Sequence, residues 1–186
     1  MRCLKLQLIK YSRKAHERGL TAAFGGNLSV RTGSLVLIKS TGSVMDDMTA
    51  GQIASITLDG KVLSPVRPSS EYRLHLEVYK KRPEVRAVVH LHPPYAIAAS
   101  SILKKELPII TPEAEIYLRR IPVIPFKPAG SVELAKSVAE GLSEVDAVLM
   151  ERHGVVTVGR TLREAFYKAE LVEESSKLWY LTRNSL

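Results

Sequence analysis

Apolar and polar positions follow two different periods along the chain, and these periods divide it into helices and strands. Residues 4–18 carry apolar side chains at helical spacing, and this pattern ends at Gly19. The same spacing recurs over residues 69–83, 130–142 and 161–181. Thr161 and Glu164 have the capping-box pattern that opens a helix. Each of these segments is therefore predicted to be an amphipathic helix.

Short apolar runs between turn residues predict the strands. They cover residues 28–31, 35–39, 55–58, 61–63, 87–92, 121–126, 147–150 and 155–158. Thr32-Gly33-Ser34 and Asp59-Gly60 are turn sequences that predict two early hairpins. Pro93-Pro94 ends the strand at residue 92, and a short helix is expected to follow through Ile102.

The order of these elements indicates the fold class. Strands alternate irregularly with helices, and two hairpins come early in the chain. This favours a mixed, mostly antiparallel central sheet flanked by helices over a doubly wound parallel sheet. No internal repeat or linker interrupts the pattern, so we expect a single α/β domain over residues 1–186.

Composition narrows the classes of function. The chain is 45% hydrophobic and 25% charged, which is typical of a globular domain. Its formal net charge is +8, but the basic residues are scattered and no aromatics interleave with them, so no nucleic-acid partner is expected. No apolar run approaches the ~20 residues needed to cross a bilayer, and no membrane partner is expected. Neither a G-x-G-x-x-G nor a G-x-x-x-x-G-K-[ST] motif supports nucleotide binding.

Two further features bear on where the protein works. Cys3 is the single cysteine, and the first residues lack the apolar core and cleavage site of a secretory signal, so a cytoplasmic location is expected. Asn and Gln are scarce, which is a compositional mark of thermophiles. They are Gln7, Asn27, Gln52 and Asn184.

Histidines supply the candidate metal ligands. His90 and His92 are two residues apart on a predicted strand, so their side chains share one face. An isolated pair of this kind is more often packed or exposed than metal-binding. His153, at another strand end, makes a three-imidazole site with an open position, which is the pattern of catalytic zinc. His16 and His75 fall within predicted helices and are interpreted as surface or packing residues.

Glu71 and three turns complete the candidate chemistry. Glu71 begins a predicted helix, where it is either a partner of the helix dipole or an acid/base. The turns Gly25-Gly26-Asn27, Ser40-Thr41-Gly42 and Ser69-Ser70 are rich in glycine and short hydroxyls. Backbone N–H groups in such turns, together with a helix N-terminus, form an anion site.

Short motifs recur here in the order and at the spacing of one known family. They are residues 26–31 (GNLSVR), 40–43 (STGS), 68–71 (PSSE) followed by Leu74-His75, His90-x-His92, 129–131 (AGS) followed by 133–135 (ELA), and 153–156 (HGVV). No single motif is diagnostic, but the set is specific. Over nearly its whole length the chain resembles the class II aldolase/adducin family.

The resemblance implies both an assembly and an activity. The assembly is a homotetramer with active sites at subunit interfaces. One Zn²⁺ per subunit would be bound by His90, His92 and His153, with Glu71 as fourth ligand and catalytic acid/base. The substrate phosphate would be held by Gly26, Asn27, Thr41, Gly42, Ser69 and Ser70. The implied reaction is zinc-dependent cleavage of a phosphorylated ketose, L-fuculose 1-phosphate or similar, to dihydroxyacetone phosphate and an aldehyde.

Departures from the family pattern concern the two ends of the substrate. Bacterial members have a threonine just before the glycine-asparagine pair, near Gly25 here, so one phosphate contact is missing. They also use a tyrosine near the place of Pro112, and the role is not carried over to the nearby Tyr117.

Three alternatives stay open at this point. A pentulose-phosphate 4-epimerase would have aspartate at the place of Glu71. A methylthioribulose-1-phosphate dehydratase would use a glutamate in the segment that contains Glu113. An adducin-like interaction module would be non-catalytic, but such modules do not keep the full histidine set.

Overall fold

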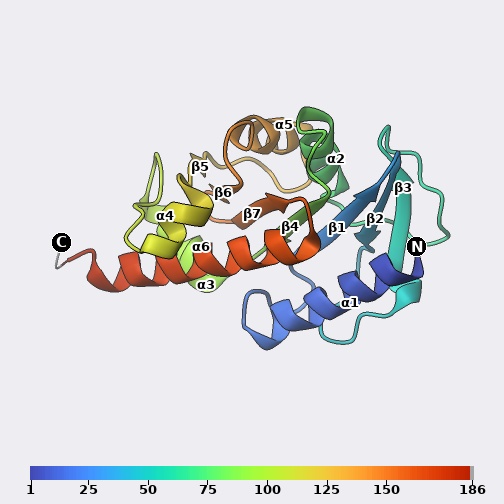
Figure 1. Ribbon diagram of the computed structural model, residues 1–186, viewed down its shortest axis with the longest axis horizontal. Coiled ribbons are helices and arrows are strands. Elements are labelled where there is room, and N and C mark those ends of the chain that lie inside the picture. Colours follow the sequence, from blue (N-terminus) through green and yellow to red (C-terminus); the bar gives the residue numbers. More distant parts are fainter. Residues whose placement is uncertain (185–186) are drawn as a thin grey trace.

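A seven-stranded sheet runs through the middle of the protein (Figure 1). The computed structural model describes residues 1–184, and the last two residues of the expected 1–186 domain lie outside the described residues. The strand order is β3-β2-β1-β4-β7-β6-β5, and every pair is antiparallel except β5 with β6, which confirms the mostly antiparallel sheet. The strands are β1 (Asn27–Thr32), β2 (Leu35–Lys39), β3 (Ile53–Thr57), β4 (Ala87–Leu91), β5 (Val123–Ile124), β6 (Ala147–Met150) and β7 (Gly154–Gly159).

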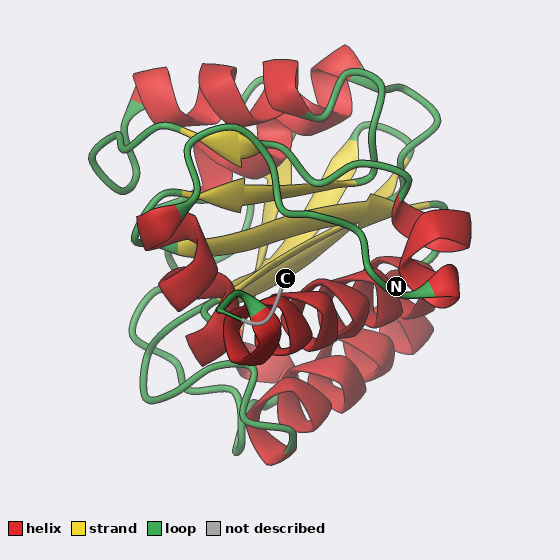
Figure 2. Cartoon of the chain, turned by 90° about the vertical axis from the view of Figure 1, so that its left-hand side faces the viewer, coloured by secondary structure: helices red, strands yellow, loops and turns green. Residues whose placement is uncertain are grey.

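Helices cover both faces of this sheet (Figure 2). Two of them, α2 and α5, pack against each other on one face, and the other face carries α1, α3, α4 and α6. Their bounds are α1 (Arg2–Glu17), α2 (Tyr72–Lys81), α3 (Pro94–Ile102), α4 (Pro112–Leu118), α5 (Val132–Gly141) and α6 (Leu162–Thr182), with a short 3₁₀ turn η1 (Ala50–Gln52). The result is a three-layer α/β domain.

The alternation of side chains in the central strands builds a separate core under each layer of helices. In β4, Val89 and Leu91 join the core beneath α1 and α6, whereas Val88 joins the core beneath α2 and α5. Because successive residues of a strand point to opposite faces, His90 shares the face of Val88. The strand pattern therefore directs this histidine toward α2.

Three expected elements differ in the structure. Residues 61–63 form no strand, and only a single bridge between Ile56 and Val62 marks the second hairpin. The strand expected over residues 121–126 shrinks to β5, because Pro122 and Pro125 lack the N–H groups that a ladder needs. The Thr161 hydroxyl caps α6 as expected, but the Glu164 carboxylate accepts from Arg160 N–H, so the capping box is only half formed.

Helix α4 was not among the sequence-based expectations. Its signal is local and short: the Thr111 hydroxyl accepts a hydrogen bond from Ala114 N–H, and Pro112 occupies the first helical position. Only Ala114 and Leu118 of this helix are buried. A buried pair four residues apart is too short a pattern to predict a helix.

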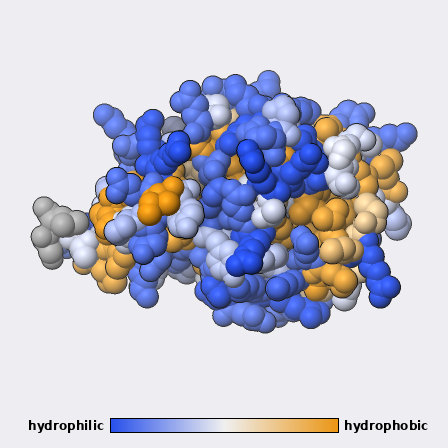
Figure 3. Space-filling view, viewed as in Figure 1, coloured by the Kyte–Doolittle hydropathy of each residue, from blue (hydrophilic) through white to orange (hydrophobic). Residues whose placement is uncertain are grey.

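The face of the molecule drawn in Figure 3 is mostly hydrophilic, with apolar side chains gathered toward the end where β3 lies in Figure 1 and in a smaller group toward the opposite end. Within residues 1–184, no helix is both long enough and apolar enough to cross a membrane.

A buried lysine of α6, Lys168, forms an ion pair with Asp146, the residue that precedes β6. Lys168 Nζ donates to Asp146 Oδ2 at 2.7 Å and to Glu164 Oε1 at 2.6 Å. Arg82 Nη1 donates to the other oxygen of Asp146 at 2.8 Å. Burial alone would raise the pKa of Asp146, but hydrogen bonds from Lys168 and Arg82 hold it below its ordinary value. Asp146 is thus the shared partner of two cations.

Replacing Asp146 by Asn should lower the free energy of unfolding by about 2 kcal/mol at neutral pH, less than the cost for a fully buried pair because Asp146 is partly exposed. The pKa of Asp146 is lower in the folded than in the unfolded chain. Its contribution is therefore present above about pH 4 and is lost as the pH falls through the folded value. Urea unfolding at neutral and acid pH should show a difference between variant and wild type that shrinks in acid.

The matched control is Glu106→Gln, which removes an ion pair between the exposed Glu106 and Arg120. It should cost less than about 1 kcal/mol. A loss in Asp146→Asn no larger than this, or one independent of pH, would contradict the role given to Asp146.

Candidate metal centre

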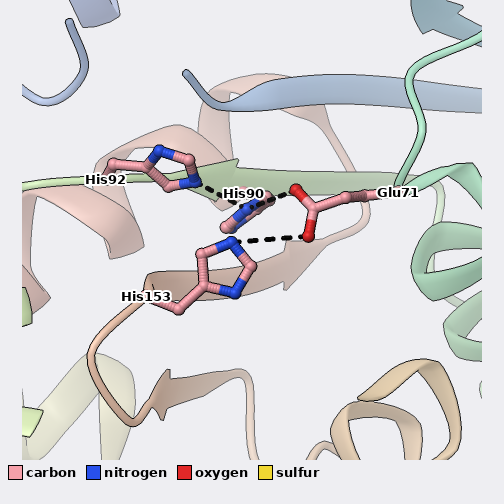
Figure 4. A group of neighbouring side chains, drawn as sticks. All are labelled: Glu71, His90, His92 and His153. Carbon is pink, nitrogen blue, oxygen red and sulfur yellow. Dashed lines mark hydrogen bonds and ion pairs between the residues drawn. The ribbon is translucent and has the colours of Figure 1, made fainter. Parts of the chain in front are cut away.

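The predicted ligands converge at one edge of the sheet (Figure 4). His90 lies in β4, His92 follows the end of that strand, His153 lies in the turn between β6 and β7, and Glu71 immediately precedes α2. One ligand atom from each lies within 4.8 Å of all the others. Because β4 and β7 are antiparallel neighbours, histidines far apart in the sequence, at positions 90 and 153, meet at the same point.

The hydrogen bonds of His90 define which ring nitrogen carries its proton. Nδ1 lies 3.0 Å from the carbonyl oxygen of Val155, which can only accept, so Nδ1 donates. In the neutral ring, Nε2 then presents a lone pair. Yet this Nε2 lies 2.9 Å from Glu71 Oε2 and 2.9 Å from His92 Nε2. A neutral His92 can donate from its Nε2 to this lone pair, but the contact with the Glu71 carboxylate requires either a proton on His90 Nε2 or a metal ion between the two groups.

Burial and nearby charge set the ionisation of the cluster. Burial, together with the charge of His90, lowers the pKa of His92 to about 3 and that of His153 to about 4. Burial would raise the pKa of Glu71, but the adjacent His90 lowers it below its ordinary value. For His90 itself burial opposes protonation, and Glu71 overcomes it and raises the pKa. Glu71 is therefore a buried carboxylate at neutral pH.

This donor set fits a divalent metal ion. Neutral imidazoles and one carboxylate are ligands that zinc prefers, and three histidines leave a position for substrate. Glu71 Oε1 is buried and accepts no hydrogen bond from the residues that the structure describes. It lies 3.4 Å from His153 Nε2. The residues that could hold the metal are thus His90, His92, His153 and Glu71.

Two glycines, Gly25 and Gly154, allow the backbone to pack closely around the His92 imidazole. A Cβ added at Gly25 would lie 2.7 Å from His92 Nδ1. A Cβ at Gly154 would lie 2.2 Å from the carbonyl oxygen of Leu91 and 3.0 Å from His92 Cδ2. Since real Cβ atoms do not approach backbone oxygen this closely, only glycine lets β7 and the residue 25–27 turn close around the imidazole.

The three glycine- and hydroxyl-rich turns gather beside this cluster. Turns 40–42 and 69–70 are neighbours, because Ser40 forms a β-bridge with Pro68 and Ser69 N–H donates to the carbonyl oxygen of Lys39. Turn 25–27 reaches the same place, because Asn27 Nδ2 donates to Glu71 Oε2 at 3.3 Å. The three segments that contain the residues expected to hold a phosphate thus lie near Glu71.

Lys39 is a residue of this region that the sequence reasoning missed. Its side chain is only 3% exposed, and Nζ makes one long hydrogen bond, 3.4 Å to the carbonyl oxygen of Phe24. No carboxylate of residues 1–184 pairs with it, and burial lowers its pKa. The lysine ends β2 between turns 25–27 and 40–42, so a buried cation without an anion borders two of the three turns. A lysine at the end of an apolar strand ordinarily indicates a surface position, which is why the pattern gave no signal.

The remaining candidates lie apart from the cluster. His16 is an exposed residue of α1, as expected. His75 is fully buried on α2, which agrees with a packing position but not with a surface one. Glu113 and Tyr117 are exposed on α4 and are not part of the histidine cluster found within residues 1–184.

Comparisons with known proteins agree with this geometry. The model of the Class II Aldolase and Adducin N-terminal domain matches residues 6–180. The chain is 38% identical over 172 residues to the L-fuculose phosphate aldolase of Methanococcus vannielii, covering 92% of this chain and 93% of the relative. It is also 33% identical over 178 residues to the 3-oxo-tetronate 4-phosphate decarboxylase of Haemophilus influenzae, covering 93% of this chain and 85% of the relative.

Solved structures give the same result. The L-fuculose-1-phosphate aldolase of Thermus thermophilus superposes with a TM-score of 0.91 at 32% identity, covering 98% of this chain and 95% of that one. Sequence and fold thus match across almost the entire chain, and the histidines and glutamate stand together at the sheet edge. The chain belongs to the class II aldolase and adducin N-terminal domain family, as one of its class II aldolases.

Proposed function

We propose that the protein is a zinc-dependent aldolase that cleaves a phosphorylated ketose, L-fuculose 1-phosphate or a close analogue, to dihydroxyacetone phosphate and an aldehyde. The observation that carries the proposal is the convergence of His90, His92, His153 and Glu71 beside turns bordered by a buried lysine that pairs with no carboxylate of residues 1–184. Names of relatives that act on fuculose phosphate support this choice of substrate.

Each group has a distinct part in the proposed reaction. A zinc ion bound by the histidines would supply a Lewis acid for the carbonyl oxygen of the ketose, where negative charge develops as the carbon–carbon bond breaks. In cleavage, the hydroxyl group that becomes the aldehyde loses its proton, and Glu71 transfers a proton to the carbon that keeps the electron pair of the broken bond. Its Oε1, which accepts no hydrogen bond within residues 1–184, is the atom free to do so.

The phosphate end of the substrate would rest on the three turns. Backbone N–H groups of residues 26, 27, 42 and 70, with the hydroxyls of Thr41, Ser69 and Ser70, form an anion cradle at the start of α2. Lys39 adds the positive charge beneath this cradle. A phosphate there would give the buried lysine a counter-ion, which no carboxylate of residues 1–184 supplies.

Substrate assays separate this function from its alternatives. A decarboxylase, as named for the relative from Haemophilus influenzae, also develops negative charge next to a carbonyl and would use the same residues. An epimerase or dehydratase would leave the phosphoketose carbon skeleton uncleaved. We expect the working form to be a homotetramer, which light scattering can check.

The first expectation concerns the metal. Release of dihydroxyacetone phosphate from L-fuculose 1-phosphate, followed with a coupled reductase, should be lost on chelation and restored by Zn²⁺. His92→Ala should abolish both the activity and the binding of one Zn²⁺ per subunit, since it removes a ligand. His16→Ala is the matched control, because it removes an exposed histidine outside the cluster. Zinc-independent cleavage by the wild type would contradict the proposal.

The second expectation concerns Glu71. Glu71→Gln keeps the shape of the side chain and removes its capacity to carry a proton, so kcat should fall by roughly 10²–10⁴-fold. The partial reaction is more specific: exchange of a carbon-bound hydrogen of dihydroxyacetone phosphate with D₂O, followed by NMR. Exchange at the wild-type rate in a folded, zinc-loaded variant would exclude Glu71 as the proton carrier.

The third expectation concerns Lys39. Lys39→Met should raise KM for the phosphorylated ketose by about 10- to 100-fold, because a hydrogen bond to a charged group contributes about 1.5–3 kcal/mol. Folding stability should not fall, since an unpaired buried charge is removed. Inhibition by inorganic phosphate should weaken in parallel. Lys61→Met, at an exposed lysine, is the control, and equal behaviour of the two variants would refute a phosphate role for Lys39.

A further inference from the structure

A buried polar seam lies between β1 and α2, directly behind the metal cluster. Asn27 and Ser29 are two residues apart on one face of β1, a step of about 6.6 Å. Along α2, Glu71, His75 and Tyr79 recur every four residues, a step of about 6 Å. The two steps nearly match, so the polar residues of the strand and helix meet in register. All five are at most 7% exposed.

Hydrogen bonds join these residues into one chain. Asn27 Nδ2 donates to Glu71 Oε2 at 3.3 Å, and His75 Nε2 is hydrogen-bonded to Asn27 Oδ1. His75 Nδ1 lies 2.7 Å from Ser29 Oγ. The same Oγ lies 2.7 Å from the Tyr79 hydroxyl oxygen.

The carboxylate at one end fixes the direction of every bond. A carboxylate only accepts, so the amide nitrogen of Asn27 must face Glu71 and its oxygen must face His75. That oxygen also only accepts, so His75 carries its proton on Nε2. Burial lowers the pKa of His75 to about 3, so the ring is neutral at physiological pH. Its Nδ1 therefore accepts from Ser29.

The far end of the chain follows from the same reasoning. The single hydroxyl proton of Ser29 is given to His75, so Ser29 must accept from Tyr79. Burial raises the pKa of Tyr79, which keeps this donor protonated. Donation therefore runs one way, from Tyr79 through Ser29, His75 and Asn27, and ends on Glu71.

We infer that His75 is a positioning residue: by donating from Nε2 it fixes the orientation of the Asn27 amide and thereby holds the Glu71 carboxylate. Without this donor, the amide can turn over and place its oxygen against the carboxylate, which is repulsive. A fixed amide also leaves the second hydrogen of Asn27 Nδ2 available toward the phosphate cradle. His75 thus controls both the acid/base and one wall of the substrate site, although it touches neither metal nor substrate.

This inference rests on the proposed function only in the role given to Glu71. Its test therefore begins with the protein itself. In the wild type, nitrogen-15 NMR of the imidazoles should show His75 as a neutral ring protonated on Nε2. A ring protonated on Nδ1, or a charged ring at pH 7, would overturn the inference whatever the enzyme cleaves.

Two variants of His75 separate positioning from packing. His75→Leu fills the space without a donor, whereas the side-chain amide of His75→Gln can donate from a place close to Nε2. The affinity for Co²⁺ alone, measured by competition with a chromophoric chelator, should fall about 10- to 100-fold in the leucine variant, with a similar fall in kcat. The glutamine variant should recover most of both. Wild-type Co²⁺ affinity in folded His75→Leu, or equal defects in both variants, would overturn the inference.

Tyr79→Phe is the matched control from the same helix and seam. It removes a buried hydroxyl but leaves Ser29 donating to His75, so melting temperature should drop while Co²⁺ affinity and kcat stay within about threefold of the wild type. A Co²⁺ defect as large as that of His75→Leu would mean that the seam matters only for packing. If the wild type cleaves no phosphoketose, the NMR and Co²⁺ measurements still decide the role of His75.

Discussion

The site depends on a buried carboxylate that faces the lone pairs of buried imidazoles. Val155 takes the Nδ1 proton of His90, so the opposite nitrogen of the ring meets Glu71 and His92 at contact distance. Such an arrangement is unfavourable unless a positive charge occupies its centre. In the protein alone a proton on His90 supplies that charge, because Glu71 raises the pKa of this ring. A metal ion satisfies all four groups at once, and the sheet, turns and helices around it serve to keep them together.

The sheet achieves this by treating its two faces differently. Toward α1 and α6 the central strands present mostly apolar side chains, as Leu28 and Val89 illustrate, and the buried Thr157 hydroxyl donates to the Ala165 carbonyl oxygen of α6. Toward α2 the same strands carry the buried polar residues Asn27 and His90, and α2 places polar side chains opposite them. A core that was apolar on both faces would be simpler to pack. The polar seam is tolerated because each of its hydrogen bonds joins a donor to an acceptor, as far as the carboxylate that ends it.

The sequence predicted the fold where the pattern was long and the site where the chemistry was distinctive. The strand of residues 35–39 was predicted with its observed bounds, and the motif around His90 and His92 indicated the metal centre without any structure. Helix α4 was missed because its buried pair, Ala114 and Leu118, spans a single turn. Short proline-flanked segments such as β5 depend on pairing with a neighbour, and no local pattern shows that pairing.

Two parts of the site could not be predicted because they arise only when distant segments meet. Lys39 ends an ordinary strand, and its isolation from any carboxylate of residues 1–184 becomes evident only once β2 is packed under the loop before Gly25. His75 was interpreted as a surface or packing residue because helical spacing alone does not say what a helix faces. Its spacing of four from both Glu71 and Tyr79 was visible in the sequence, but its meaning required β1 to lie alongside in register.

The closeness of Gly25 and Gly154 to His92 has a consequence for how new substrate preferences can arise. Neither position can accept a side chain without moving the imidazole or the β4 backbone. Phe24, which precedes Gly25, is exposed and has no such restriction. In a library that randomises this region, functional variants should carry many different residues at exposed positions such as Phe24 but only glycine at positions 25 and 154. New substrate preferences are therefore expected to arise by substitution of exposed residues around the metal centre and not at the two glycines that pack against His92.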